Sequence, residues 1–178
     1  MIIYKDLDKL HHIVREALIS LMTTIHAEQL HFKIFETWRD PLRQMILYCQ
    51  GREYPGAKIT WSKMSLHSVG LAVDFVLCDS NGNLTSDSWK YEGYEDRWDR
   101  FGELAKQYGF EWGGDWKTPD RPHIQISGGL TIEQIIYDNY DNVIPFRDYA
   151  DIAYIKELEI AREYYKLLIS SCNQLVIR

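Results

Sequence analysis

The sequence has few of the features that mark secreted, disulfide-bonded or nucleic-acid-binding proteins. Its 178 residues include three cysteines, an odd number without the close spacing of a zinc knuckle. We therefore expect reduced thiols in a protein that folds in the cytosol. Lysine and arginine form no cluster and the formal net charge is −6, so the composition argues against a nucleic-acid partner.

Long apolar runs are also absent. The N-terminal segment MIIYKDLDKLHHIVREALI carries charged residues every few positions, unlike the unbroken apolar centre of a secretion signal. No later segment approaches the length of a membrane span. We expect synthesis in the cytoplasm without a signal peptide. The composition, 46% hydrophobic and 26% charged, is that of a globular domain with a substantial core.

Local patterns predict helices and strands in an irregular order. Apolar spacing and aromatic or β-branched runs predict helices over 10–30, 41–49, 94–108 and beyond Pro145, and strands over 31–39, 71–77 and 122–126. Asp40 and Pro41 suit the start of the second helix, and Thr131 with Gln134 fits the capping box of a short helix. Because no βαβ alternation is present, we expect an α+β domain.

The aspartate inside the apolar run 71–77 is the first chemical anomaly. Burying Asp74 without a partner would cost several kcal/mol, so it needs a cation or a set of donors. His67 lies in an irregular segment that Gly70 would turn back toward this strand, and His123 shares a strand face with Gln125. Two imidazoles and one carboxylate suit a catalytic zinc with an open fourth position.

Two further residues have candidate roles in catalysis. Asp120 lies three residues before His123, where a carboxylate would serve as general base and then general acid. Arg39 ends the first predicted strand and would donate to a substrate carboxylate or to the oxyanion. Each residue also has an ordinary structural alternative: a buried carboxylate bonded to amides for Asp74, a core histidine for His123, a turn for Asp120, and a helix cap or a surface ion pair for Arg39.

The motifs together resemble a known family of zinc peptidases. The pattern Ser65-x-His67-x-x-Gly70-x-Ala72-x-Asp74, followed by Asp120-x-Pro122-His123, resembles the M15 family of D-alanyl-D-alanine carboxypeptidases and L-alanyl-D-glutamate endopeptidases. The resemblance spans residues 34–127 and includes the segment 111–116. It implies the fold shared with the hedgehog signalling domain, a small and mainly antiparallel sheet flanked by helices. We expect this domain over residues 1–128, with a helical extension over 129–178 packed on it.

The resemblance also implies roles for individual residues. It makes His67, Asp74 and His123 the zinc ligands, Asp120 the catalytic base, and Arg39 a residue that binds substrate or stabilises the transition state. Ser65, Trp112 and Gln125 would contact substrate or support the site, although Trp112 is equally compatible with a buried structural role. Trp38 stands where the family usually has tyrosine, which predicts a substrate pocket that differs in detail.

The expected substrate is the stem peptide of peptidoglycan. Endolysin-like members resemble this chain in using aspartate, rather than glutamate, at the position of Asp120, so we expect cleavage between L-alanine and D-glutamate. The absence of a secretion signal then favours a phage-type lysis enzyme that accumulates until the membrane is permeabilised. Two alternatives stay open: a D,D-carboxypeptidase or dipeptidase, and a binding module that keeps the zinc without catalysis.

Overall fold

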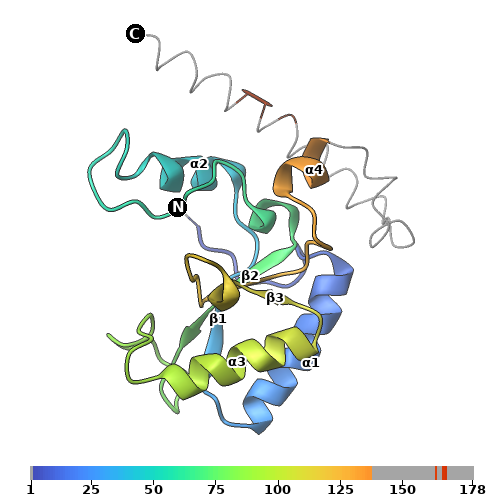
Figure 1. The fold of residues 1–178 in the computed structure, drawn as a ribbon, viewed down its shortest axis with the longest axis vertical. Coiled ribbons are helices and arrows are strands. Elements are labelled where there is room, and N and C mark those ends of the chain that lie inside the picture. The colour runs from blue at the N-terminus through green and yellow to red at the C-terminus, as the bar shows by residue number, and fades with distance from the viewer. Residues whose placement is uncertain (1, 138–162, 164–165, 168–178) are drawn as a thin grey trace. The chain divides into compact units, whose positions relative to one another are not determined.

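A computed structural model describes residues 2–137 together with residues 163, 166 and 167 (Figure 1). Backbone contacts divide these residues into two compact units, which are described separately. One unit holds residues 2–38 and 70–126, and the other holds residues 39–69 and 127–137.

The first unit is built on a four-stranded sheet with the order β1-β2-β4-β3. The strands are β1 (Phe32–Glu36), β2 (Ala72–Leu77), β3 (Glu111–Trp112) and β4 (His123–Gln125). Every neighbouring pair is antiparallel. Two helices, α1 (His12–Ala27) and α3 (Glu95–Gln107), complete this unit, together with the 3-10 helix η2 (Gly113–Asp115). This architecture confirms the α+β prediction.

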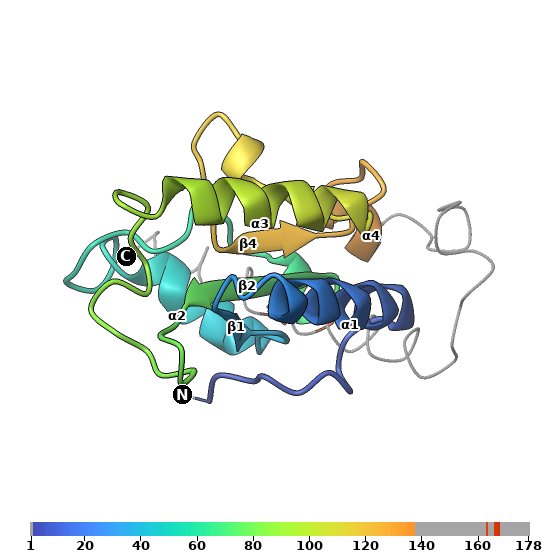
Figure 2. The ribbon, with the colours of Figure 1, turned by 90° about the horizontal axis from the view of Figure 1, so that it is seen from below.

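The two long helices lie along the sheet (Figure 2). Phe75 of β2 packs on Phe101 of α3, with ring centroids 5.0 Å apart. Phe32 of β1 contacts the same ring at 4.7 Å. Since side chains alternate along a strand, Asp74 points to the sheet face opposite to the one that carries Phe75. The apolar face therefore stabilises the unit and leaves the other face for polar residues.

The second unit contains shorter elements. They are α2 (Pro41–Cys49), the 3-10 helix η1 (Leu66–Val69) and α4 (Ile132–Tyr137). The predicted caps are present: the Asp40 carboxylate accepts from the backbone N–H of Leu42 at 2.8 Å. Gln134 Oε1 accepts from the backbone N–H of Thr131 at 2.8 Å, and Thr131 Oγ1 accepts from the backbone N–H of Gln134 at 3.2 Å. These reciprocal bonds satisfy donors that a helix start would otherwise leave unpaired.

Most predicted elements are confirmed, with shorter bounds than the patterns suggested. Sequence patterns did not predict β3, because a strand of two residues is too short to show alternation. The helix predicted beyond Pro145 lies outside the described residues, so the extension over 129–178 stays a prediction. Cys78 is a free thiol. Within the described residues, none of the helices is both long and apolar enough to cross a membrane.

A glycine in the middle of α3 allows close contact with the segment before the site. A Cβ built on Gly102 would lie 2.2 Å from the Trp112 ring, and one on Gly114 would lie 2.3 Å from it. The indole is therefore held between two glycines, and its N–H donates to the Arg121 carbonyl at 2.9 Å. Trp112 thus joins α3 to the chain that leads into β4.

We predict that Gly102→Ala lowers the free energy of unfolding by about 1–2 kcal/mol. Because the added Cβ would lie only 2.2 Å from the Trp112 ring, the cost of overpacking should fall in the upper part of its usual range, about 2–3 kcal/mol, and the better helix propensity of alanine offsets about 1 kcal/mol of that. Urea unfolding followed by circular dichroism measures the change. The control is Gln107→Ala on the exposed end of the same helix, which should stay within about 0.5 kcal/mol of wild type. Unchanged or increased stability of Gly102→Ala would contradict the tight packing.

Candidate active site

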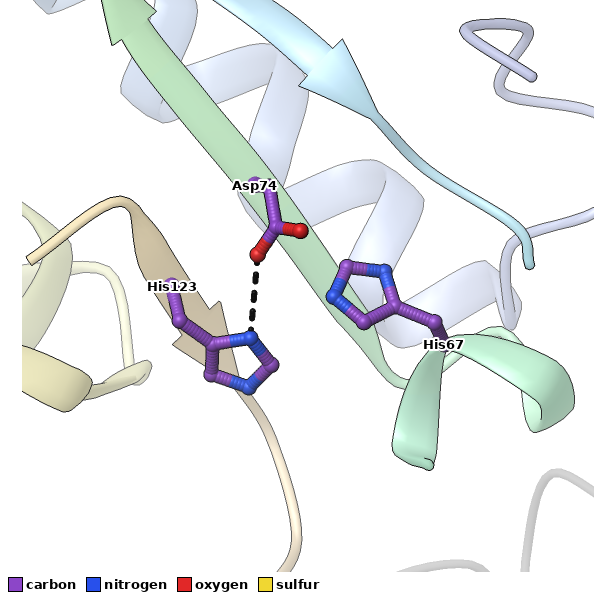
Figure 3. Close-up of side chains that lie close together, drawn as sticks. All are labelled: His67, Asp74 and His123. Atoms are coloured by element: carbon purple, nitrogen blue, oxygen red, sulfur yellow. Dashed lines mark hydrogen bonds and ion pairs between the residues drawn. The ribbon is translucent and has the colours of Figure 1, made fainter. Parts of the chain in front are cut away.

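The site is centred on a pair of residues on adjacent antiparallel strands. Asp74 of β2 lies directly opposite His123 of β4, and the Asp74 Oδ1 atom is 3.0 Å from His123 Nδ1. Both side chains are largely buried, with 14% and 11% of their surface exposed. His67 of η1 completes a group of three, because one ligand atom from each residue lies within 4.8 Å of the other two (Figure 3).

The segment that carries His67 has local features that hold its backbone. The backbone N–H of His67 donates to Ser65 Oγ at 3.3 Å, and the His67 carbonyl accepts from the Arg39 N–H at 3.3 Å. Gly70, which follows η1, has a positive φ of 69°, and a Cβ there would lie 2.5 Å from the Lys9 carbonyl oxygen. The sequence therefore needs glycine where the chain passes from η1 toward β2.

The donor set fits a metal ion. His123 faces the Asp74 carboxylate through Nδ1 and the Gln125 carbonyl oxygen through Nε2, each at 3.0 Å. Both partners are acceptors, so a neutral imidazole, with one N–H, can satisfy only one of them. The other nitrogen requires a second proton or a metal cation. Two histidines and one carboxylate are also the ligand types of catalytic zinc sites that keep a position open.

The electrostatic environment of His123 favours positive charge. Burial is the largest single effect and lowers the pKa of His123, but the hydrogen bond that His123 donates to Asp74 and the charges of Asp74 and Asp120 together raise this pKa above its ordinary value. The same negative field would stabilise a bound cation. Asp120 is thus close enough to His123 to act on it electrostatically.

The backbone around Asp120 is held by the loop that precedes β4. Its N–H donates to the Gly113 carbonyl at 2.8 Å, and its own carbonyl accepts from the His123 N–H at 3.1 Å. A Cβ on Gly113 would lie 2.3 Å from the Asp120 carbonyl oxygen. The Asp120 residue itself is exposed to solvent, which suits a carboxylate that exchanges protons.

An aromatic residue that sequence patterns did not single out lies beside the site. The Trp116 ring is centred 5.2 Å from that of His123 and is 39% exposed. The signal in the sequence was a tryptophan two residues after the pair Gly113 and Gly114. That signal is weak, because periodicity gives no information in a loop. The exposed indole is a candidate substrate-binding surface beside His123.

Arg39 is held by a buried glutamine that sequence patterns also did not single out. Its Nη1 donates to Gln44 Oε1 at 2.9 Å, and Gln44 is 1% exposed. The Gln44 amide nitrogen donates in turn to the Ser62 carbonyl at 2.7 Å and to Thr60 Oγ1 at 3.3 Å. The guanidinium is therefore pre-oriented by groups of its own unit.

Three other predicted residues differ in their surroundings. Trp112 is 7% exposed and packed between glycines, which supports the structural alternative; its contact with substrate stays a prediction. Ser65 accepts from the His67 backbone, in line with a supporting role. Gln125 donates to the Glu111 carboxylate at 2.7 Å and accepts from His123, so both ends of its amide are engaged within the protein.

Comparison with known proteins identifies the family. Residues 59–126 match an M15 peptidase family described as D-alanyl-D-alanine carboxypeptidase. The chain is 36% identical over 123 residues to the peptidoglycan L-alanyl-D-glutamate endopeptidase CwlK of Bacillus subtilis (strain 168). This match covers 66% of this chain and 73% of CwlK. It is 42% identical over 64 residues to an L-alanyl-D-glutamate peptidase of Listeria phage A118, a match that covers 35% of this chain and 21% of the phage protein.

A solved structure also resembles this one. The crystal structure of the Serratia marcescens L-Ala D-Glu endopeptidase ChiX matches with a TM-score of 0.43 and 25% sequence identity, over 84% of this chain and 85% of that chain. The relatives match the family that the motifs around His67, Asp74 and His123 predicted. By its identity to CwlK, the chain is a member of the M15 family of zinc-dependent peptidases, and His67, Asp74 and His123 form a group that could hold the metal ion.

Proposed function

We propose that this protein is a zinc peptidase that hydrolyses the L-alanyl-D-glutamate bond in the stem peptides of peptidoglycan. The observation that carries the proposal is the group of His67, Asp74 and His123, in a chain that is 36% identical to an endopeptidase named for this bond. Asp120, three residues before the last histidine, matches the endolysin-like branch in the family resemblance.

The proposed mechanism assigns each side chain a separate task. His67, Asp74 and His123 would hold the zinc ion, which supplies Lewis-acid polarisation of the scissile carbonyl and lowers the pKa of water. Asp120 would take a proton from the attacking water and return it to the leaving amine. Arg39, oriented by Gln44, would donate hydrogen bonds to a substrate carboxylate or to the developing oxyanion.

A D,D-carboxypeptidase is the second candidate function. The description of the matching family as D-alanyl-D-alanine carboxypeptidase favours it. The two activities share the zinc chemistry and differ in the bond that is placed over the site. A third possibility is a binding module without catalysis. A binding module would not need a general base, so the presence of Asp120, exposed to solvent beside the site, argues against it.

The biological setting that we propose is cell-wall lysis of the phage type. The likeness to a phage L-alanyl-D-glutamate peptidase supports this setting. The enzyme would accumulate in the cytoplasm and reach the wall after the membrane is permeabilised. A virion-borne enzyme or a bacterial recycling peptidase would use the same site.

Digestion of purified peptidoglycan with the zinc-loaded protein tests the reaction. We expect new L-alanine carboxyl and D-glutamate amino termini, identified by mass spectrometry, and none after chelation of the metal. Release of D-alanine would assign the protein to the carboxypeptidase branch instead. If the protein binds zinc but cleaves none of several peptidoglycan chemotypes, the binding module becomes the better assignment.

The role of Asp120 gives a second prediction. Asp120→Asn should lower kcat by about 100- to 10,000-fold, the usual contribution of a general acid–base, with zinc binding retained. The measurement is kcat on a stem-peptide substrate together with the zinc content. Asp115→Asn is the matched control, because Asp115 is an exposed carboxylate on the same loop that pairs with Lys106. Equal kcat for both variants would exclude Asp120 as the base.

Removal of one ligand gives a third prediction. His67→Ala should weaken zinc binding by more than about 100-fold, since loss of an outer hydrogen-bond partner alone typically costs 10- to 100-fold. Competition with a chromophoric chelator measures the affinity. His26→Ala, which removes an exposed histidine in the last turn of α1, should bind zinc as the wild type does. Similar affinities for the two variants would show that His67 is not a ligand.

A further inference from the structure

A line of hydrogen bonds runs across three strands on the polar face of the sheet. Glu111 of β3 lies opposite Gln125 of β4, and its Oε2 accepts from the Gln125 amide at 2.7 Å. Gln125 Oε1 is 3.0 Å from His123 Nε2. On the far side of the ring, His123 Nδ1 faces Asp74. The side chains of Glu111, Gln125, His123 and Asp74 thus form a line from the edge of the sheet to the candidate zinc site.

The carboxylate at the outer end sets the direction of these bonds. An ionised carboxylate only accepts hydrogen bonds, so the Gln125 amide must present its NH₂ to Glu111. The carbonyl oxygen of Gln125 must then face His123. Because that oxygen can only accept, His123 carries a proton on Nε2. In the neutral imidazole, Nδ1 is then left with a lone pair, directed at the side where Asp74 and His67 lie.

We propose that Gln125 and Glu111 are positioning residues for the zinc site. Their hydrogen bonds hold the His123 ring and keep its proton on Nε2, so that Nδ1 is the metal-binding atom. Outer partners of metal-bound histidines commonly fix the tautomer and orientation in this way. This inference rests on the proposed zinc site, and it gives Gln125 a role through His123 rather than in contact with substrate.

Replacing the glutamine tests the proposal directly. Gln125→Leu keeps the side-chain size and removes both hydrogen bonds, so zinc affinity should fall by about 10- to 100-fold. Affinity is measured by competition with a chromophoric chelator, independently of peptide cleavage. Gln107→Leu is the matched control: it makes the same chemical change at an exposed position of α3 and should leave the affinity within about twofold of wild type.

Exchanging the two outer residues tests the direction of the bonds. In the double variant Glu111→Gln with Gln125→Glu, the new carboxylate accepts from His123 Nε2–H and from the new amide. The polarity and net charge are unchanged, so zinc affinity should return to within about threefold of wild type. An affinity about 10-fold or more below that of the wild type would overturn the proposal. This comparison also decides the case if Gln125→Leu does not fold.

Nitrogen-15 spectra of the histidine rings supply a signature that a purely structural role would not give. In the zinc-loaded wild type we expect a proton on His123 Nε2 and the metal on Nδ1. Coordination through Nε2, or equal zinc affinity for wild type and Gln125→Leu, would overturn the inference while leaving the zinc site in place. A wild type that binds no zinc would overturn both. Lost cleavage with unchanged affinity would return Gln125 to a substrate contact.

Discussion

The register between β2 and β4 is the constraint on which the site depends. It places Asp74 opposite His123, on the sheet face away from the aromatic residues that pack on α3. A slip of one residue would turn every side chain of one strand to the other face. Ile124, which is fully buried, would then face the polar side and His123 the apolar core. The burial of Ile124 and Phe75 therefore stabilises the geometry of the ligands as well as the fold.

Polar groups on this face are arranged so that acceptors outnumber donors around His123. The ring has a carboxylate on one side and an amide oxygen on the other, and the charge of Asp120 adds to the negative field. Such an arrangement is unfavourable around a neutral imidazole, because the ring nitrogen without a proton directs its lone pair at a buried acceptor. A zinc ion bound here would remove this imbalance, which gives a physical reason for an aspartate within an apolar strand.

Sequence patterns predicted the parts of the structure that periodicity and motifs encode. Apolar spacing gave α1 and α3, the capping residues gave the starts of α2 and α4, and the motif order gave His67, Asp74 and His123. The patterns could not give β3, Trp116 or Gln44, since each depends on contacts between different elements or loops, which the periodicity of a single segment does not encode. The strand pattern placed Gln125 on the same face as His123. Its bond to Glu111 could not be predicted, because it depends on the pairing of β4 with β3, a strand of two residues that shows no alternation.

The long separation between the ligands has a consequence for how the protein folds. Asp74 and His123 are 49 positions apart in the sequence, so their meeting closes a large loop, with an entropic cost that grows slowly with loop length. Contacts of such long range form late and slow the folding of small domains. A metal that binds only after this closure would hold β2 and β4 together in the folded sheet. Its binding free energy would then add to the stability of the native state.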